Sequence, residues 1–269
     1  MLIAVAALIL TVPASEAQIR KQPGAREASV GTARGVAGQG ESQSAAGDTA
    51  ADEAVALLAR WQHAKARTIL ETAGTGGGLE TAWGLLLAEE GKVDDGIARL
   101  RAAKDVLAGD PAPAYWLGEV LYTFRRDLSG GTEAWRAAEA RASAILDKAH
   151  DDPRASFYAG ASRVRLKRFD AAREALEVAA ANGWDPAMVA YQQGLSYAFE
   201  QKWSDAASRL TAALEADLSY AHAWYYRALC REKLKQTSEM LADLERFLQL
   251  APDAPEAETA RSILKAAGY

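Results

Sequence analysis

From about residue 52 onward, apolar side chains recur three and four residues apart, with charged side chains between them. An α-helix turns once about every 3.6 residues, so this spacing places the apolar side chains on one face of a helix. Clusters of Gly, Pro, Asp and Asn interrupt the pattern at 74–78, 109–111, 151–153, 182–186 and 251–252. No stretch shows the strict alternation typical of a strand. The pattern predicts an all-α chain of many short helices.

Small residues recur with a fixed period along these helices. Gly84 recurs as Gly118 and Gly160 recurs as Gly194, in both cases at a spacing of 34, and Ala228 follows at the same spacing. Three further positions repeat in each unit, 12, 16 and 19 residues after its glycine. They are Gly96, Leu100 and Ala103 after Gly84, Ala172, Leu176 and Ala179 after Gly160, and Ala206, Leu210 and Ala213 after Gly194. Small residues on two facing helices allow the helices to approach closely. The period therefore predicts stacked hairpins of antiparallel helices.

The period and these small residues resemble the tetratricopeptide repeat. The resemblance is carried by TAWGLLLAEEGKVDDGIARLRAA, AYQQGLSYAFEQKWSDAASRLTAAL and AWYYRALCREKLKQTSEMLADLERFLQLAP. In the last fragment Trp224 and Pro252 stand at the fourth and thirty-second places, as in the consensus of that family. The resemblance implies an all-α fold, a right-handed α–α superhelix of antiparallel helical hairpins.

The predicted solenoid spans residues 52–269 and divides into units of one hairpin each. The units are a divergent first hairpin at 52–76, repeats at about 77–110, 111–152, 153–186, 187–220 and 221–254, and a capping helix at 255–267. A stack of repeats needs such a cap because its last repeat otherwise leaves an apolar face exposed. The unit at 111–152 is longer than the others, and we expect its extra residues in an inserted loop around 127–131.

The N-terminus has a different character. The apolar run MLIAVAALILTV is followed by Pro13 and by small residues Ser15 and Ala17, which predicts a signal peptide at 1–17 and a periplasmic or secreted location. No Lys or Arg precedes the run, so a retained anchor is the alternative, although a membrane-spanning helix needs about 20 apolar residues. Residues 18–51 are rich in Gly, Ala, Ser and Gln and are predicted to form a disordered linker.

The candidate chemistry is sparse. The net charge of -5 and the lack of a basic stripe argue against nucleic-acid binding. The single cysteine, Cys230, excludes a disulfide within the chain, and we expect it to be a small buried side chain. His63, His150 and His222 lie far apart without metal-ligand spacing, and no phosphate-loop Lys follows the glycines at 74–78. We therefore expect no cofactor, no metal and no enzymatic activity.

The resemblance implies that the first helices of the repeats line a concave groove. By register, nine aromatic residues are candidates for this surface: Tyr115, Trp116, Tyr122, Phe157, Tyr158, Tyr191, Phe199, Tyr225 and Tyr226. Aromatic rings offer large contact areas at little cost in rotamer entropy, which favours binding of a protein or peptide. The alternative is that these rings pack between neighbouring helices and build the core.

Members of the family that grip a C-terminal carboxylate use Lys and Asn at fixed groove positions. Here those places hold aromatics, Glu119 and Gln192, so we expect no such clamp. Arg154, Arg165 and Lys233 are the candidates for contact with acidic groups of a partner. The function predicted is an exported, non-catalytic scaffold for a protein or peptide. Its alternatives are a self-associating structural protein and a membrane-tethered assembly factor of a cell-envelope complex, the latter only if the segment 1–17 is retained.

Overall fold

The computed structural model describes residues 40–268, which form thirteen α-helices and no strand. These helices are α2 (Gly40–Ala59), α3 (His63–Ala73), α4 (Leu79–Glu89), α5 (Val93–Val106), α6 (Ala112–Arg125), α7 (Leu128–Leu146), α8 (Pro153–Arg165), α9 (Phe169–Ala181), α10 (Pro186–Phe199), α11 (Trp203–Ala216), α12 (Ala221–Lys233), α13 (Thr237–Leu250) and α14 (Ala257–Ala266). The predicted signal segment, residues 1–17, and residues 18–39 of the predicted linker lie outside the described residues. Between residues 40 and 268, no helix is both long and apolar enough to span a bilayer.

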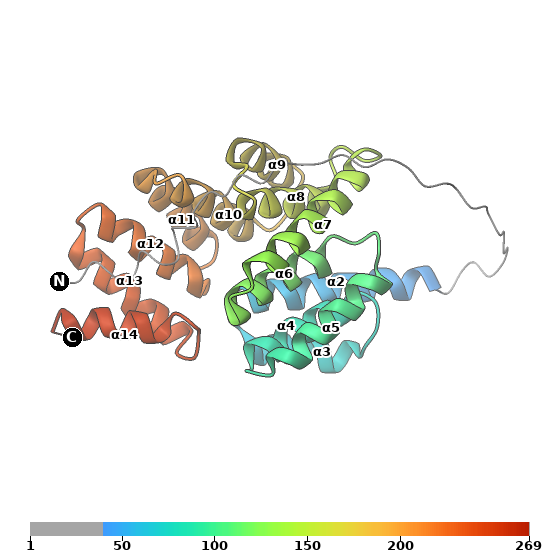
Figure 1. The fold of residues 1–269 in the computed structure, drawn as a ribbon, viewed down its shortest axis with the longest axis horizontal. Helices are drawn as coiled ribbons and strands as arrows, with labels where there is room; N and C mark the ends of the chain where they lie inside the picture. The colour runs from blue at the N-terminus through green and yellow to red at the C-terminus, as the bar shows by residue number, and fades with distance from the viewer. Residues whose placement is uncertain (1–39, 269) are drawn as a thin grey trace.

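Consecutive helices pair into hairpins, and the hairpins stack in chain order (Figure 1). The pairs are α2–α3, α4–α5, α6–α7, α8–α9, α10–α11 and α12–α13, and α14 packs on α13. Every hairpin turns on one residue with positive φ: Trp61, Gly91, Arg126, Lys167, Gln201 and Lys235. The prediction of an all-α solenoid is confirmed.

Close approach of the two helices within a hairpin explains the periodic small residues. A Cβ atom on Gly194 of α10 would lie 2.7 Å from Leu210 Cγ of α11, closer than carbon atoms pack. Gly160 would meet Leu176 at the same distance, and a Cβ atom on Gly96 would lie 2.6 Å from the carbonyl oxygen of the residue at 84. The small residues therefore recur with the repeat because each hairpin brings its two helices into the same close contact.

The first hairpin is longer than the sequence predicted. Ala54, Ala66 and Leu70 are buried with spacings of 12 and 16, as in the later repeats. Helix α2 begins at Gly40, so the linker prediction is wrong for residues 40–51. Packing of its C-terminal half nucleates this helix, and each further residue then extends it at little cost, particularly through alanine.

The extra residues of the 111–152 unit do not form an inserted loop. The Asp127 side chain accepts a hydrogen bond from the Gly130 backbone N–H at 2.8 Å and caps α7, which starts at Leu128. Helix α7 has 19 residues, whereas the second helices of the other four full repeats have 13 or 14. Gly131 lies inside this helix against Gly118 of α6. The loop prediction is therefore wrong, because the glycines allow α6 and α7 to approach instead of breaking the helix.

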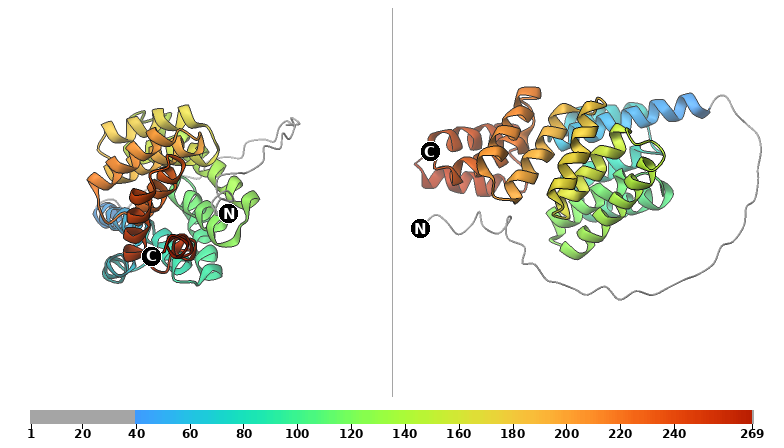
Figure 2. Two further views of the ribbon diagram at one scale, coloured as in Figure 1. Left: turned by 90° about the vertical axis from the view of Figure 1, so that its left-hand side faces the viewer. Right: turned by 90° about the horizontal axis from the view of Figure 1, so that it is seen from above.

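The superhelix winds tightly enough for its two ends to approach each other. The left view of Figure 2 looks along the superhelix and shows the hairpins arranged around a common centre. Arg60, directly after α2, forms ion pairs with Asp185 and Asp217, which lie 125 and 157 positions further along the chain. The residue after α2 thus reaches across the concave face predicted as a groove, to the segments before α10 and α12.

Candidate functional site

Arg60, the residue that follows α2, connects the first hairpin to the segments before α10 and α12. Arg60 is only 7% exposed. Its Nη2 lies 2.5 Å from Asp185 Oδ2, and its Nε lies 2.6 Å from Asp217 Oδ2. The guanidinium also lies over the Tyr220 ring, 5.4 Å from the centroid. Burial lowers the pKa of Arg60, but Asp185, Asp217 and Tyr220 together outweigh this effect and leave the pKa raised.

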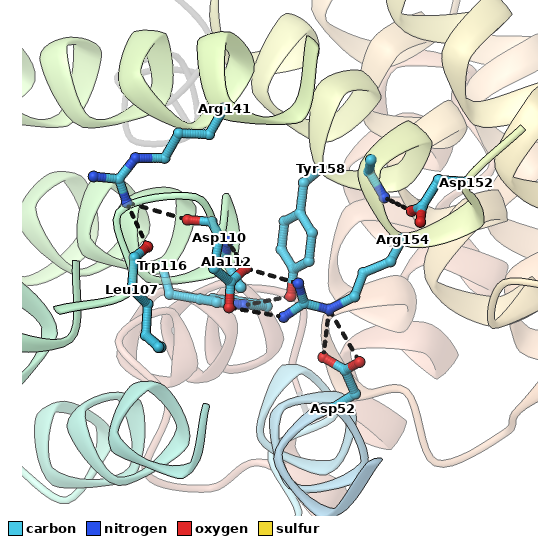
Figure 3. A network of polar contacts seen from close by, with 10 residues as sticks. Asp52, Leu107, Asp110, Ala112, Trp116, Arg141, Asp152, Arg154 and Tyr158 are labelled. Atoms are coloured by element: carbon cyan, nitrogen blue, oxygen red, sulfur yellow. Dashed lines mark hydrogen bonds and ion pairs between the residues drawn. The ribbon is translucent and has the colours of Figure 1, made fainter. Parts of the chain in front are cut away.

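A second arginine ties α2 to the middle of the solenoid (Figure 3). Arg154, in the first turn of α8, donates from Nε to both carboxylate oxygens of Asp52 at 3.0 Å. Its Nη1 donates to Asp110 Oδ1 at 2.7 Å, and Arg141 donates to the Asp110 carbonyl at 3.1 Å. Arg154 was a candidate for contact with a partner's acidic groups. Its guanidinium is instead taken up by carboxylates of its own chain.

An aromatic contact joins the first turn to the C-terminal repeat. The Trp61 ring lies 4.6 Å from the His63 ring and 5.5 Å from the His222 ring of α12. His63 Nε2 lies 3.0 Å from Glu89 Oε2, and His222 Nε2 lies 3.4 Å from Glu256 Oε2. Burial raises the pKa of Glu89. Burial alone lowers the pKa of His222, but Glu256 and Glu89 together reverse this effect and raise it. His222, with a smaller effect of Arg126, holds the pKa of Glu256 low against the effect of burial.

Seven of the nine predicted groove aromatics are buried, at most 8% exposed: Tyr115, Trp116, Phe157, Tyr158, Tyr191, Tyr225 and Tyr226. Phe157 stacks on Trp184 at 5.3 Å, and Tyr225 packs against Phe247 at 5.0 Å. These two rings have the packing role that was the alternative to partner binding. Tyr158 accepts a hydrogen bond from Trp116 Nε1 at 3.3 Å and lies under Arg154, so it too serves the interior.

The remaining four buried rings surround a small central cavity of about 100 Å³. We call it the central cavity; its walls come from α2, α4, α6, α8, α10, α12 and the segment before α14. Arg165 and Glu119 meet in its wall, with Nε–Oε1 and Nη2–Oε2 distances of 2.8 and 2.5 Å. Burial lowers the pKa of Arg165, but Glu119, Tyr115 and Tyr226 together more than offset that effect and leave the pKa raised.

The other two predicted aromatics, Tyr122 and Phe199, are half-buried and line one larger hollow of about 280 Å³. We call it the open hollow. Its apolar lining is Tyr122, Leu128, Trp135, Val164, Leu166, Phe169 and Phe199, and its cationic side chains are Arg136, Arg165 and Lys167. No acidic residue is part of this lining. The Arg165 guanidinium lies 5.9 Å from both the Trp135 and the Phe199 ring centroids.

The groove register missed several residues of the open hollow. Leu128 and Arg136 belong to α7, and Phe169 begins α9, so all three come from second helices or their first turns. The register considered first helices alone. The one signal in the sequence was Leu128, a large apolar residue directly after a helix cap, which is 41% exposed in the structure.

Other chemistry is limited in the described part of the chain. No group of three or more His, Cys, Asp and Glu side chains between residues 40 and 268 is arranged to hold a metal ion. Cys230 is 1% exposed, and burial raises the pKa of its thiol to about 12. A thiol with so high a pKa is a poor nucleophile at neutral pH.

Comparisons with known proteins agree with this architecture. Residues 191–255 match the family described as tetratricopeptide repeat, and no curated protein sequence matches the chain significantly. TTC0263, a thermophilic tetratricopeptide-repeat protein of Thermus thermophilus, is similar over 69% of this chain and 97% of its own, with 18% identity and a TM-score of 0.52. A chain of the APC/C hetero-tetramer Cut9–Hcn1 is similar over 82% of this chain and 42% of its own, with 17% identity and a TM-score of 0.50. The described chain is thus a right-handed α–α superhelix of the tetratricopeptide type, a fold suited to protein interaction.

Proposed function

We propose that this protein is an exported, non-catalytic scaffold that binds an acidic peptide segment of a protein partner in the open hollow. The observation that carries the proposal is the meeting of Tyr122 and Phe199, from two different repeats, in one apolar hollow with a cationic rim. These are the two predicted groove aromatics that the interior does not bury.

Charge selects the kind of peptide. Arg136 is exposed and forms no ion pair with any residue between 40 and 268, and the hollow has cationic but no acidic lining residues. A peptide that places an aromatic or aliphatic side chain in the hollow and Asp or Glu at its rim is complementary in both shape and charge. Such complementarity raises association rates and discriminates against basic peptides.

The test uses two labelled peptides with the same Phe- and Leu-containing core, one flanked by Asp and Glu and the other by Lys. We expect the acidic peptide to bind the full chain and the basic peptide to bind far more weakly. Arg136→Glu should weaken acidic-peptide binding about tenfold, or about 1.4 kcal/mol. Arg209→Glu makes the same charge change at an exposed position of α11 outside the hollow and should leave binding unchanged.

The apolar contact has its own control. Phe199→Ala should abolish measurable binding, whereas Leu218→Ala, at a residue 61% exposed in another turn, should not. Equal binding of the acidic and basic peptides, or no effect of Arg136→Glu, would show that the open hollow is not the site. Light scattering of the unliganded chain at several concentrations distinguishes peptide binding from the alternative of self-association, in which a second copy would cover the open hollow.

Export rests on residues 1–17 alone and is tested separately. Intact mass measurement of the mature protein from its native host should show a chain beginning near Gln18. A chain that keeps the segment 1–17 and sediments with membranes would support the tethered alternative and contradict release into the periplasm or medium.

A further inference from the structure

The central cavity is lined by aromatic rings from both ends of the superhelix. Seven rings of Phe, Trp and Tyr line it: Trp61, Tyr115, Trp116, Phe124, Tyr191, Tyr220 and Tyr226. The rings of Tyr191 and Tyr220 are 4.7 Å apart, and those of Tyr191 and Tyr226 are 6.0 Å apart. Aromatic faces attract cations within about 6 Å of the ring centroid, more strongly where water is excluded. The cavity therefore has the walls of a cation-binding cage.

Acidic side chains outnumber basic ones in the lining of the same cavity. Glu89, Glu119 and Glu256 line it, with Arg165 as the one guanidinium and His222 as the one imidazole. Arg165 directs two nitrogens to the two oxygens of Glu119, so these charges offset each other. Glu89 Oε2 lies 3.0 Å from His63 Nε2, and Glu256 Oε2 lies 3.4 Å from His222 Nε2 and also feels the charge of Arg126. The lining thus holds three carboxyl groups against one guanidinium and one imidazole.

Unpartnered polar atoms show what kind of ligand the cavity lacks. Gln192 is 4% exposed, and its Nε2 donates to Tyr115 Oη at 3.0 Å, but its Oε1 has no hydrogen-bond partner among residues 40–268. Glu89 Oε2 and Glu256 Oε2 form ion pairs with His63 and His222, but neither oxygen accepts a hydrogen bond from a residue between 40 and 268. All three atoms are acceptors. A buried acceptor without a hydrogen bond destabilises the fold, so a ligand with N–H donors would be favoured here.

We propose that the central cavity binds a small alkylammonium group, held by the aromatic rings and by the acceptor oxygens of Glu89, Gln192 and Glu256. Its volume of about 100 Å³ exceeds that of a few water molecules, each of which takes about 10–15 Å³ by this measure. Exposed Pro255 and half-buried Trp61 are part of its lining, so the cavity opens to solvent where the first hairpin meets the C-terminal cap. A bound cation would contact both ends of the superhelix and hold them together.

The test is isothermal titration calorimetry of the full chain with n-butylammonium chloride at constant ionic strength. We expect saturable binding with a dissociation constant in the millimolar range or tighter, as for other ligands of this size. The neutral analogue n-butanol and the anion butanoate should not bind. A Gly-Lys-Gly peptide distinguishes the source of the ligand: tighter binding than n-butylammonium indicates a lysine side chain of a partner, and weaker binding indicates a free amine.

Matched variants place the binding in this cavity. Glu89→Gln keeps the size of the side chain and removes its charge, and it should weaken n-butylammonium binding at least about tenfold because a charge within a few ångströms is lost. Glu215→Gln removes a charge at an exposed position of α11 and should leave binding unchanged. Tyr226→Leu keeps an apolar wall without a ring and should also weaken binding. Absence of saturable heat, equal binding of n-butanol, or identical behaviour of the Glu89 and Glu215 variants would overturn the proposal.

Discussion

Replacing Arg60 by methionine tests whether the first hairpin is pinned across the concave face. The methionine keeps an apolar stem and a high helix propensity but removes the guanidinium. In the structure that guanidinium bonds to Asp185 and Asp217, donates to the Ala56 carbonyl at 2.7 Å and lies over Tyr220. Arg60→Met therefore leaves two carboxylates facing the first hairpin without their counter-ion.

The magnitude follows from the burial of the three charges. Removing one partner of a fully buried ion pair destabilises a protein by about 3–5 kcal/mol. The Arg60 side chain is 8% exposed, but Asp185 and Asp217 are each 29% exposed, so water solvates them in part once they are unpaired. We therefore expect Arg60→Met to lower the free energy of unfolding by about 2–3 kcal/mol.

The assay is urea unfolding followed by far-UV circular dichroism, with the radius of gyration from small-angle X-ray scattering. The variant should also show a larger radius of gyration, because the closure of the superhelix is weakened. Arg209→Met, at an exposed residue without an ion pair among residues 40–268, should change the free energy of unfolding by less than about 0.5 kcal/mol. In a double-mutant cycle, Asp217→Asn and Arg60→Met should show a coupling of about 1–2 kcal/mol. A loss below about 1 kcal/mol with no coupling would refute this account of the closure.

Two further predictions concern helix packing and pH. Gly194→Ala should lower the free energy of unfolding, measured in urea, by about 1–3 kcal/mol, because its Cβ would lie 2.7 Å from the Leu210 side chain. Gly109→Ala places its Cβ in open space and should leave the free energy of unfolding unchanged. Equal effects of the two substitutions would contradict the close approach of α10 and α11. The raised pKa of His222 and the lowered pKa of Glu256 mean that the stabilising effect of His222 is fully present below about pH 6.5 and is lost as pH rises through its folded-state pKa. The free energy of unfolding should therefore fall between about pH 6.5 and 8, and His222→Gln should reduce this fall. An unchanged pH dependence in the variant would exclude the His222–Glu256 pair as the cause of the fall.

The repeat architecture was determined by the sequence alone. Helical periodicity and the small residues at fixed spacing, such as Gly194 and its partner Leu210, express contacts within one hairpin. These contacts join residues that are close in the chain, so a local pattern is enough to reveal them. The exceptions were the start of α2, where the helix continues through residues typical of linkers, and the length of α7, where Gly131 packs against α6.

Only the tertiary structure decided what became of the concave face. Small rotations between successive hairpins add up over six units, and their sum brings Arg60 to Asp217, 157 residues away. No local pattern encodes that sum, so the sequence identified Tyr191 and Tyr226 as groove residues without showing that they are buried around a cavity that Trp61 also lines. Tyr122 and Phe199 stayed accessible because they lie at the opposite ends of their helices from the edge that α2 covers. The aromatic surface was thus a property of the sequence, and its division into a buried cavity and an open hollow was a property of the superhelix.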